Sequence, residues 1–300
     1  MKKLILFLVV YIAFLPLFPA AALAESSADF LFEDTEEFYE PDISNGPWVY
    51  HSKDLTVCVR KTHEYNKVCF VADIYLRNNE KAYTGWAKMK PKTRQTELPH
   101  IIARRYGAVF AITGDYVSHG KNQKGVMIRD GNVYYDKKNA DTLAVLPSGE
   151  MEVYAKGATT AKELLLKGVD DSLAFGPIIV KDGKITKSAL THPLKPPNRR
   201  AGIGKVEDGH YIAIVSSDKF TFKEYAQIFI AHGCEWAYNL DGGHSAAMII
   251  MGEQVNFHNA ESILGKDTIT RQRPIPDLLL FGRSFLVPDV KEKAVYKGSR

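Results

Sequence analysis

Short apolar runs joined by tight turns recur along this chain of 300 residues, and they constrain its fold more than any other feature. Asp130-Gly131, Asp182-Gly183 and Asp208-Gly209 each separate two such runs, and Asp-Gly between apolar runs is a strong signal for a β-hairpin. Further turns are predicted at Pro147–Gly149 and near Gly252. Because a hairpin pairs its strands antiparallel, the sequence predicts mostly antiparallel sheets.

Three segments carry helix signals instead. Thr160 with Glu163, and Thr221 with Glu224, have the spacing of a capping box, and each pair is followed by an apolar stripe and a glycine. The third segment, Thr96–Gly107, has a proline in its first turn. A few helices flanking hairpin-built antiparallel sheets make the predicted class α+β, with a single catalytic-type domain over residues 48–284.

The first 24 residues have the order of a secretory signal peptide. Lys2 and Lys3 precede an apolar run that closes at Ala24, after which cleavage is expected. An uncleaved membrane anchor stays open as the alternative, since the apolar run is long. The protein is expected to be secreted or in the cell envelope, with no membrane span after cleavage. Residues 25–47 are interpreted as an acidic linker and residues 285–300 as a charged tail.

Charge and cysteine content bear on three further properties: nucleic-acid binding, disulfide formation and metal binding. The formal net charge is +4 and the charges are dispersed, which argues against a nucleic-acid partner. Cys58 and Cys69 are equidistant from the centre of a polar turn between two alternating strands, so a disulfide is predicted for this pair where the geometry permits it. Cys234 is left as a buried free thiol. A metal site at Cys58, His63 and Cys69 lacks a fourth ligand, so no metal ligand is assigned.

A polar stretch of five residues, Asp241–Ser245, interrupts two apolar runs. The glycines at 242 and 243 remove side-chain bulk, and successive N–H groups of this kind can form an anion site. Asp241 beside them can accept a proton, bind a sugar hydroxyl or ligate a metal. The alternative is an ordinary turn in which Asp241 caps its own backbone.

Three other stretches have related composition. Thr113-Gly114-Asp115-Tyr116 again puts a glycine and a carboxylate at the end of an apolar strand. Phe175-Gly176-Pro177 interrupts a strand, which indicates a bulge or the close approach of a ligand. Asn198-Arg199-Arg200 follows a proline-rich loop, and arginine offers a planar fork suited to phosphate or carboxylate. For Arg199 alone, a solvated loop is the alternative.

Taken in chain order, as Thr113–Tyr116, Phe175–Pro177, Asn198–Arg200 and Asp241–Ser245, these four stretches resemble the phosphodiester glycosidase family, the family of the enzyme that uncovers mannose 6-phosphate by removing N-acetylglucosamine. The resemblance covers about residues 50–282, and four ordered motifs are more specific than one glycine pair. The chain also departs from the family pattern. Thr113 replaces an asparagine, His244 a third glycine and Ala246 a second serine. Val215–Phe220 stands where the family often has Val-Asp-Gly-Arg.

The resemblance implies hydrolysis of a sugar-1-phosphodiester bond in cell-envelope or extracellular glycan. It implies a carboxylate pair, with Asp241 at the sugar carbon and Asp115 activating water. Arg200 would stabilise the leaving phosphate together with two backbone N–H groups. His244 would act as general acid/base or bind phosphate, and the alternative is that it only fills space. The implied substrate-binding residues are Thr113, Gly114, Gly176, Pro177, Asn239, Gly242, Gly243 and Ser245.

A binding protein is the rival function. The same pocket could hold a phosphoglycan of the cell envelope without cleaving it, and a purely structural envelope protein is a third alternative. For the hydrolase and for the binding protein, the expected partner is a phosphate-linked sugar or an envelope glycan. No cofactor is expected, and a divalent metal is left open.

Overall fold

The computed structural model describes residues 37–41, 47–78, 80–90, 95–115, 125–256, 259–260, 268–269 and 272–290, and of residues 259–260 and 268–269 only the backbone. The predicted signal peptide, most of the predicted linker, Tyr116 and most of the predicted tail lie outside these residues. The described part belongs to one compact unit, Glu36–Arg300. Within it, no helix combines the length and apolar character that a bilayer crossing requires.

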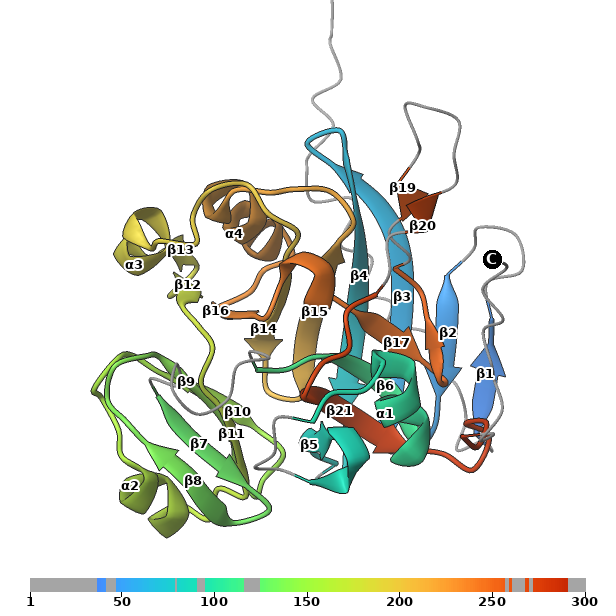
Figure 1. The fold of residues 1–300 in the computed structure, drawn as a ribbon, viewed down its shortest axis with the longest axis horizontal. Coiled ribbons are helices and arrows are strands. Elements are labelled where there is room, and N and C mark those ends of the chain that lie inside the picture. Colours follow the sequence, from blue (N-terminus) through green and yellow to red (C-terminus); the bar gives the residue numbers. More distant parts are fainter. Residues whose placement is uncertain are drawn as a thin grey trace, which may run out of the picture. The chain divides into compact units, whose positions relative to one another are not determined.

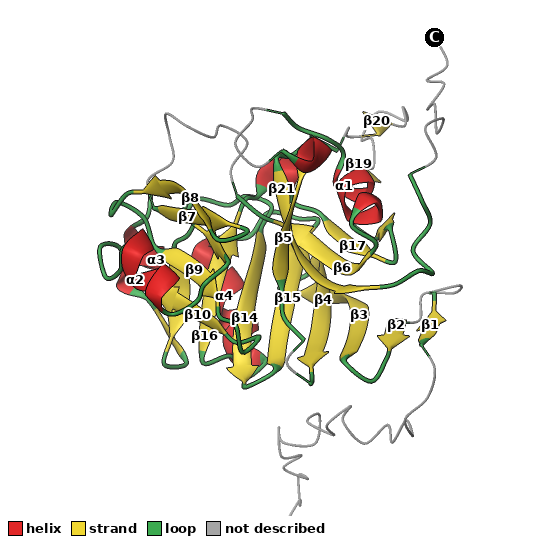
Figure 2. Ribbon diagram, turned by 90° about the horizontal axis from the view of Figure 1, so that it is seen from below, coloured by secondary structure: helices red, strands yellow, loops and turns green. Residues whose placement is uncertain are grey.

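Three large sheets form the fold, and every strand pairing among the described residues is antiparallel. The nine-stranded sheet contains, in spatial order, β1 (Phe38–Glu40), β2 (Trp48–His51), β3 (Leu55–Glu64), β4 (Lys67–Leu76), β15 (His210–Ser216), β14 (Ala201–Glu207), β16 (Trp236–Leu240), β12 (Ile178–Lys181) and β13 (Lys184–Ile185). Figure 2 shows the run from β16 to β1 side by side. Phe38–Glu40 lies in the segment interpreted as a linker, yet it pairs with β2 as a strand.

Two sheets have five strands each. One contains β10 (Met151–Tyr154), β9 (Thr142–Val145), β11 (Asp171–Leu173), β7 (Val126–Arg129) and β8 (Asn132–Asp136). The other contains β18 (Glu253–Gln254), β17 (Met248–Ile250), β6 (Ala108–Thr113), β21 (Asp277–Arg283) and β5 (Tyr83–Trp86). A two-stranded pair, β19 (Asn259–Ala260) and β20 (Thr268–Ile269), completes the described strands.

The predicted turns are where the sequence places them. Asp130-Gly131, Asp182-Gly183 and Asp208-Gly209 connect β7 to β8, β12 to β13 and β14 to β15. In each pair the glycine has a positive φ, which glycine adopts without strain. The turns at Pro147–Gly149 and Gly252 connect β9 to β10 and β17 to β18. The mostly antiparallel α+β prediction is confirmed.

The predicted helices are also present. Their bounds are α1 (Pro99–Arg105), α2 (Ala161–Leu166) and α4 (Phe222–Ala231), and the shorter helices are α3 (Lys187–Thr191), η2 (Ala87–Met89) and η3 (Gly243–Ser245). Both predicted capping boxes form: Thr160 and Thr221 each accept a hydrogen bond from the glutamate N–H three residues later. The sequence interpretation missed α3, which has five residues and no apolar period.

The apolar core is layered. Buried side chains of the nine-stranded sheet, such as Val57, pack with Ile112 and Leu143 of the two five-stranded sheets. On the other face of the large sheet, Phe229 of α4 forms a second cluster. α2 covers the sheet of β7–β11 and α1 covers the sheet of β6 and β21 (Figure 1). Helices therefore flank the sheets, and the strand ends between layers are left for polar residues.

The predicted disulfide between Cys58 and Cys69 is wrong. Glu64 pairs with Lys67, so the β3–β4 turn lies at Tyr65-Asn66, two residues beyond the assumed centre. Cys58 consequently faces Asp73, while Cys69 faces Thr62. Four residues of strand separate the two cysteines, about 13 Å, which no disulfide spans. Both are free thiols, as is Cys234.

Candidate active site

The first and fourth sequence stretches meet where β6 and β16 end. The Asp241 N–H donates to the Gly114 carbonyl at 3.1 Å. Thr113 Oγ1 donates to the Ser245 carbonyl at 2.7 Å and accepts from the Ala247 N–H at 2.8 Å. Two strands from different sheets are thus joined through backbone atoms and one buried hydroxyl. In this chain the hydroxyl of Thr113, at the position where the family pattern has asparagine, makes these hydrogen bonds.

The third stretch packs behind the glycine pair. A Cβ added to Gly242 would lie 2.4 Å from the Arg199 carbonyl oxygen, so no larger residue fits. Gly243 has φ of +63° and its N–H donates to the same oxygen at 2.9 Å. The glycines are therefore required by packing and conformation. Of the two N–H groups predicted to bind an anion, that of Gly243 bonds within the protein, and that of Gly242 interacts with the Asp241 carboxyl.

Asp241 is the carboxyl group at the centre of this turn. Asp241 is 5% exposed, and this burial raises the pKa of its carboxyl group to about 7. The Ser245 hydroxyl, the Gly242 N–H and the charge of Arg273 lower the pKa in part, while Asp277 raises it. A carboxyl with this pKa is about half ionised at neutral pH, so it can take up or release a proton there.

Buried polar atoms without partners gather in this turn. Seven buried side-chain oxygen or nitrogen atoms in the described part of the chain have no partner with hydrogen-bond geometry, and three lie between residues 239 and 245: Asn239 Oδ1, Asp241 Oδ2 and Ser245 Oγ. An unpaired buried polar group costs about 1–3 kcal/mol. Such a cluster indicates groups arranged to bond with a ligand rather than with the fold.

The second stretch orients Asn239. Asn239 Nδ2 donates to the Gly176 carbonyl at 2.9 Å, and its backbone N–H donates to the Pro177 carbonyl at 3.0 Å. Gly176 has φ of +65°, a conformation that favours glycine. All four stretches therefore contribute to one place. Gly176 and Pro177 contribute backbone carbonyls that fix Asn239, and Gly114 contributes the carbonyl that fixes Asp241.

Asp115 lies in a different environment. It is fully buried, with Oδ1 accepting from the Ala174 N–H at 2.9 Å and Oδ2 accepting from Arg129 at 2.8 Å. Arg129 also pairs with Asp277 at 3.1 Å, and Asp277 accepts the Asp115 N–H at 2.7 Å. Burial lowers the pKa of Arg129, but the surrounding carboxylates outweigh it and hold the pKa above its ordinary value. We call Arg129, Asp115 and Asp277 the buried ionic cluster.

Arg200 also bonds within the protein. Its Nε donates to the Phe220 carbonyl at 3.0 Å, and its Nη2 donates to Leu194 and Pro196 carbonyls at 2.8 and 2.6 Å. The guanidinium lies 4.0 Å from the ring centroid of Phe222. Burial lowers its pKa to about 10, which leaves it charged at neutral pH. These bonds hold Arg200 on the proline loop, so they supply a structural role where a phosphate ligand was predicted.

Two exposed residues, His244 and Arg273, lie at the rim of the turn. The side chain of His244 is exposed, and its backbone carbonyl accepts from the Arg273 N–H and from Gln272 Nε2, both at 3.1 Å. Arg273 is exposed and close enough for its charge to lower the pKa of Asp241. The sequence interpretation missed Arg273, Arg129 and Asp277. The available signal was weak: Arg129 and Asp277 are single charged residues beside apolar runs, and Arg273 stands between a glutamine and a proline.

With this geometry established, the chain can be compared with known proteins. The model of the phosphodiester glycosidase family matches residues 106–282, more than half of the chain. The chain belongs to this family. Membership supports a glycosidase-type function, and the four motifs of the site lie inside the matched region.

Individual relatives are more distant. The SPbeta prophage-derived uncharacterized protein YomE of Bacillus subtilis (strain 168) is 29% identical over 177 residues, 55% of this chain but 28% of that protein. The chain thus spans just over a quarter of the length of this relative.

Two solved structures share the fold at low identity. The auto-inhibited catalytic domain of zebrafish N-acetylglucosamine-1-phosphodiester alpha-N-acetylglucosaminidase is 15% identical, with a TM-score of 0.61, over 83% of this chain and 88% of that one. A hypothetical protein from Synechocystis is 12% identical, also with a TM-score of 0.61, over 79% of this chain and 64% of that one. At these identities the likeness shows the fold alone.

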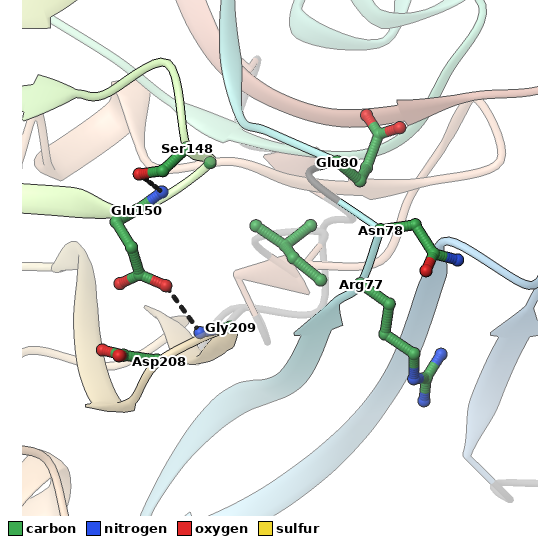
Figure 3. A pocket seen from close by; sticks show the side chains of 9 residues that line it. Arg77, Asn78, Glu80, Ser148, Glu150, Asp208 and Gly209 are labelled. Carbon is green, nitrogen blue, oxygen red and sulfur yellow. Dashed lines mark hydrogen bonds between the residues drawn. The ribbon is translucent and has the colours of Figure 1, made fainter.

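A cavity of about 230 Å³ lies far from the motifs of the phosphodiester glycosidase family. Residues from the end of β4, the β9–β10 turn and the β14–β15 turn line it (Figure 3). β14 begins beside Leu240 and ends at this cavity, so about 20 Å of strand separate it from Asp241. Its Glu150 accepts from the Gly209 N–H at 2.9 Å and from the Tyr211 hydroxyl at 3.0 Å, which indicates a structural role.

Metal binding has little support among the residues that the structure describes. No three His, Cys, Asp or Glu side chains in them come together as a candidate metal site. The expectation that no cofactor is needed stays a prediction.

Proposed function

We propose that this member of the family is an exported hydrolase that cleaves a sugar-1-phosphodiester in cell-envelope or extracellular glycan. One observation carries the proposal. The motif carboxyl of Asp241 is buried, has a pKa of about 7 and leaves Oδ2 without a partner in hydrogen-bond geometry, beside the Ser245 hydroxyl that lowers this pKa. Carboxyl groups with pKa values shifted by burial are concentrated in active sites.

In the reaction, the oxygen of water bonds to the sugar C1, the bond from C1 to the phosphate oxygen breaks, and the proton that the water loses passes to the released phosphate monoester or to solvent. The phosphate monoester leaves with the electron pair of that bond. As C1 develops positive charge, the ionised Asp241 carboxylate stabilises or attacks it. Asn239 Oδ1 and Ser245 Oγ accept or donate hydrogen bonds to substrate oxygens. A phosphate monoester is a good leaving group, so it needs positive charge more than a proton.

The geometry favours Arg273 as the source of that positive charge. Arg200 donates to three backbone carbonyls, whereas Arg273 is exposed beside Asp241. His244 at the rim of the turn is assigned to the same phosphate. For Asp115, its contacts with Arg129 and the Ala174 N–H favour positioning of the β6 end over activation of water.

The test is turnover of a panel of sugar-1-phosphodiesters by the full chain, measured as release of free sugar. Asp241→Asn keeps the shape of the side chain and removes its titration, and we expect it to slow turnover about 10³-fold. Asp182→Asn is the matched control, because Asp182 is exposed in the β12–β13 turn, where asparagine tolerates the positive φ. Equal loss in both variants, or no loss in Asp241→Asn, would remove Asp241 from the mechanism.

A phosphoglycan-binding protein on the same fold is the second candidate. It is favoured by the internal bonds of Arg200 and of the Gly243 N–H, two groups that were predicted to stabilise the leaving phosphate. The same panel separates the two functions. Glycosyl phosphodiesters that raise the melting temperature without releasing sugar indicate a binder, and release of sugar indicates the hydrolase.

A further inference from the structure

A second cavity is lined in part by Arg199, whose carbonyl oxygen contacts the Asp241 turn. It has a volume of about 420 Å³, within the size range of small-molecule sites. Its lining comes from the β3–β4 turn, the segment after β15 and the residue before Arg200. The lining residues are Asn66, Lys67, Arg199, Ser217, Asp218 and Lys219. The segment after β15 is the one in which this chain departs from the family's Val-Asp-Gly-Arg.

The lining has a surplus of positive charge. It contains three cations and one carboxylate, and Asp218 Oδ2 already accepts the Val68 N–H at 2.7 Å. Lys67 pairs with Glu224 at 2.7 Å. Arg199 and Lys219 form no ion pair with any other residue that the structure describes. Two cationic side chains are therefore available to an anion in the cavity.

The walls of the cavity are fixed by backbone bonds. The N–H groups of Ser217 and Asp218 donate to the Val68 carbonyl at 3.0 and 3.3 Å. Arg199 Nε donates to the Ser217 carbonyl at 2.8 Å, which orients its guanidinium along the wall. A ligand would thus bind to groups that are already in place, with little ordering of the chain.

Arg199 connects this cavity to the catalytic turn. Its side chain lines the cavity, while its carbonyl oxygen accepts the Gly243 N–H and lies against Gly242. Asn198, the residue before it, lies 3.7 Å from the position of a Gly243 Cβ. The Asp241 turn and the cavity therefore contact the same residue, the turn through the Arg199 backbone and the cavity through the Arg199 side chain.

We propose that this cavity binds a phosphoryl group on the leaving-group side of the substrate, through Arg199 and Lys219. Arginine matches phosphate with a planar fork of donors, and lysine adds a point charge. The preferred substrate class is then a sugar 1-phosphate esterified to an alcohol that carries a second phosphate. The substrate preference depends on the proposed hydrolase function. The binding of phosphate in the cavity does not depend on it.

The first experiment measures binding, without turnover. The full chain is titrated with inorganic phosphate by calorimetry at low ionic strength, where charge–charge contacts are least screened. Lys219→Gln removes one charge from an exposed side chain, and we expect phosphate affinity to fall about tenfold, because a charge-assisted contact to the phosphate is lost. Lys223→Gln, an exposed lysine on α4 outside the lining, is the matched control and should bind as the wild type does.

The second experiment measures specificity. Two substrates share one sugar 1-phosphate, and only one has a second phosphate in its leaving group. We expect Lys219→Gln to raise KM about tenfold for the doubly phosphorylated substrate, with kcat and the other substrate unchanged. Arg199→Lys keeps the charge but not the fork, and we expect a smaller rise in KM.

The outcomes distinguish this proposal from the hydrolase. If no substrate turns over but phosphate binding is lost in Lys219→Gln, the hydrolase proposal fails and the cavity proposal stands. If both substrates turn over and Lys219→Gln has the KM and kcat of the wild type for each of them, the cavity proposal is overturned and the hydrolase proposal stands. Wild-type protein that shows no saturable phosphate binding also overturns the cavity proposal.

Discussion

Two carboxylates of this chain follow apolar strands beside a glycine, and the fold treats them in opposite ways. Asp115 is fully buried and both of its oxygens have partners, including Arg129 at 2.8 Å. Asp241 is almost as buried, yet its Oδ2 has no partner among the described residues and its pKa is raised to about 7. The same local sequence pattern thus yields one group that stabilises the structure and one that is available for chemistry.

The difference arises from residues distant in sequence. Asp115 meets Arg129 of β7 and Asp277 of β21, so its charge is compensated where three strands come together. Among the described residues, the cation whose charge acts on Asp241 is the exposed Arg273, and burial outweighs it in raising the pKa of Asp241. A buried charge with a complete set of partners supports the fold. One without partners costs stability, and function is the usual reason why a protein retains it.

The largest predicted effect concerns the buried ionic cluster. Arg129→Met would leave two buried carboxylates without their cation, and we expect the free energy of unfolding to fall by about 3–5 kcal/mol. Arg60→Met is the matched control, because Arg60 pairs with Asp73 at 2.9 Å with 47% of its side chain exposed, and such a pair contributes about 0–1 kcal/mol. Urea unfolding measures both. Equal losses in the two variants would contradict the contrast between Asp115 and Asp241.

Local chemistry made most of the fold predictable. Asp-Gly turns and capping boxes act within four residues, so they mark β7–β8, β12–β13, β14–β15 and the starts of α2 and α4 correctly. The β3–β4 turn at Tyr65-Asn66 contains no glycine, although both residues have a positive φ. Without that signal the hairpin centre was misplaced, and the disulfide prediction failed with it.

The site was predictable in position but not in detail. Ordered motifs indicated that Thr113, Asn198 and Asp241 belong together, and the backbone bonds at the two strand ends bring them together. The direction in which a side chain points depends on tertiary neighbours. Arg200 and Arg199 are adjacent in sequence, yet one donates to loop carbonyls and the other lines a cavity. No feature of "NRR" distinguishes them.

The second prediction tests the stability cost of Asp241. The folded-state pKa of Asp241, about 7, lies above the ordinary value of 3.8. Between these pH values the folded state holds a proton that the unfolded state has released. Stability is therefore lost as pH rises from about 4 to about 7, by on the order of 3 kcal/mol in total. Asp241→Asn removes this loss, so the variant should gain stability relative to the wild type across that window.

Urea unfolding of both proteins at pH 4, 5.5, 7 and 8 measures this difference. Asp182→Asn serves as the control, since it makes the same substitution at an exposed residue outside the Asp241 turn. A difference between Asp241→Asn and wild type that stays constant with pH would show that Asp241 titrates normally.

The third prediction concerns the pH dependence of activity. If ionised Asp241 stabilises the developing charge at C1, kcat/KM must rise tenfold per pH unit below about pH 7 and level off above it. The apparent pKa of this rise belongs to the free enzyme. The positive charge of the exposed Arg273 lowers the pKa of Asp241. A higher ionic strength screens this charge, so it should raise the pKa of Asp241 and move the rise in kcat/KM to higher pH. A rise centred near pH 4 would contradict the assignment.

The smallest predicted effect concerns the hydroxyl that joins the two strand ends. Thr113→Val leaves the buried Ala247 N–H without its acceptor and the Ser245 carbonyl without its donor at 2.7 Å. We expect a loss of about 1–2 kcal/mol in the free energy of unfolding. Thr113→Ser retains the hydroxyl, so it should recover most of that stability. Because the Ser245 carbonyl is released only in Thr113→Val, that variant should also lower kcat/KM. A loss of stability with full activity would show that Thr113 holds the fold but does not position the Asp241 turn.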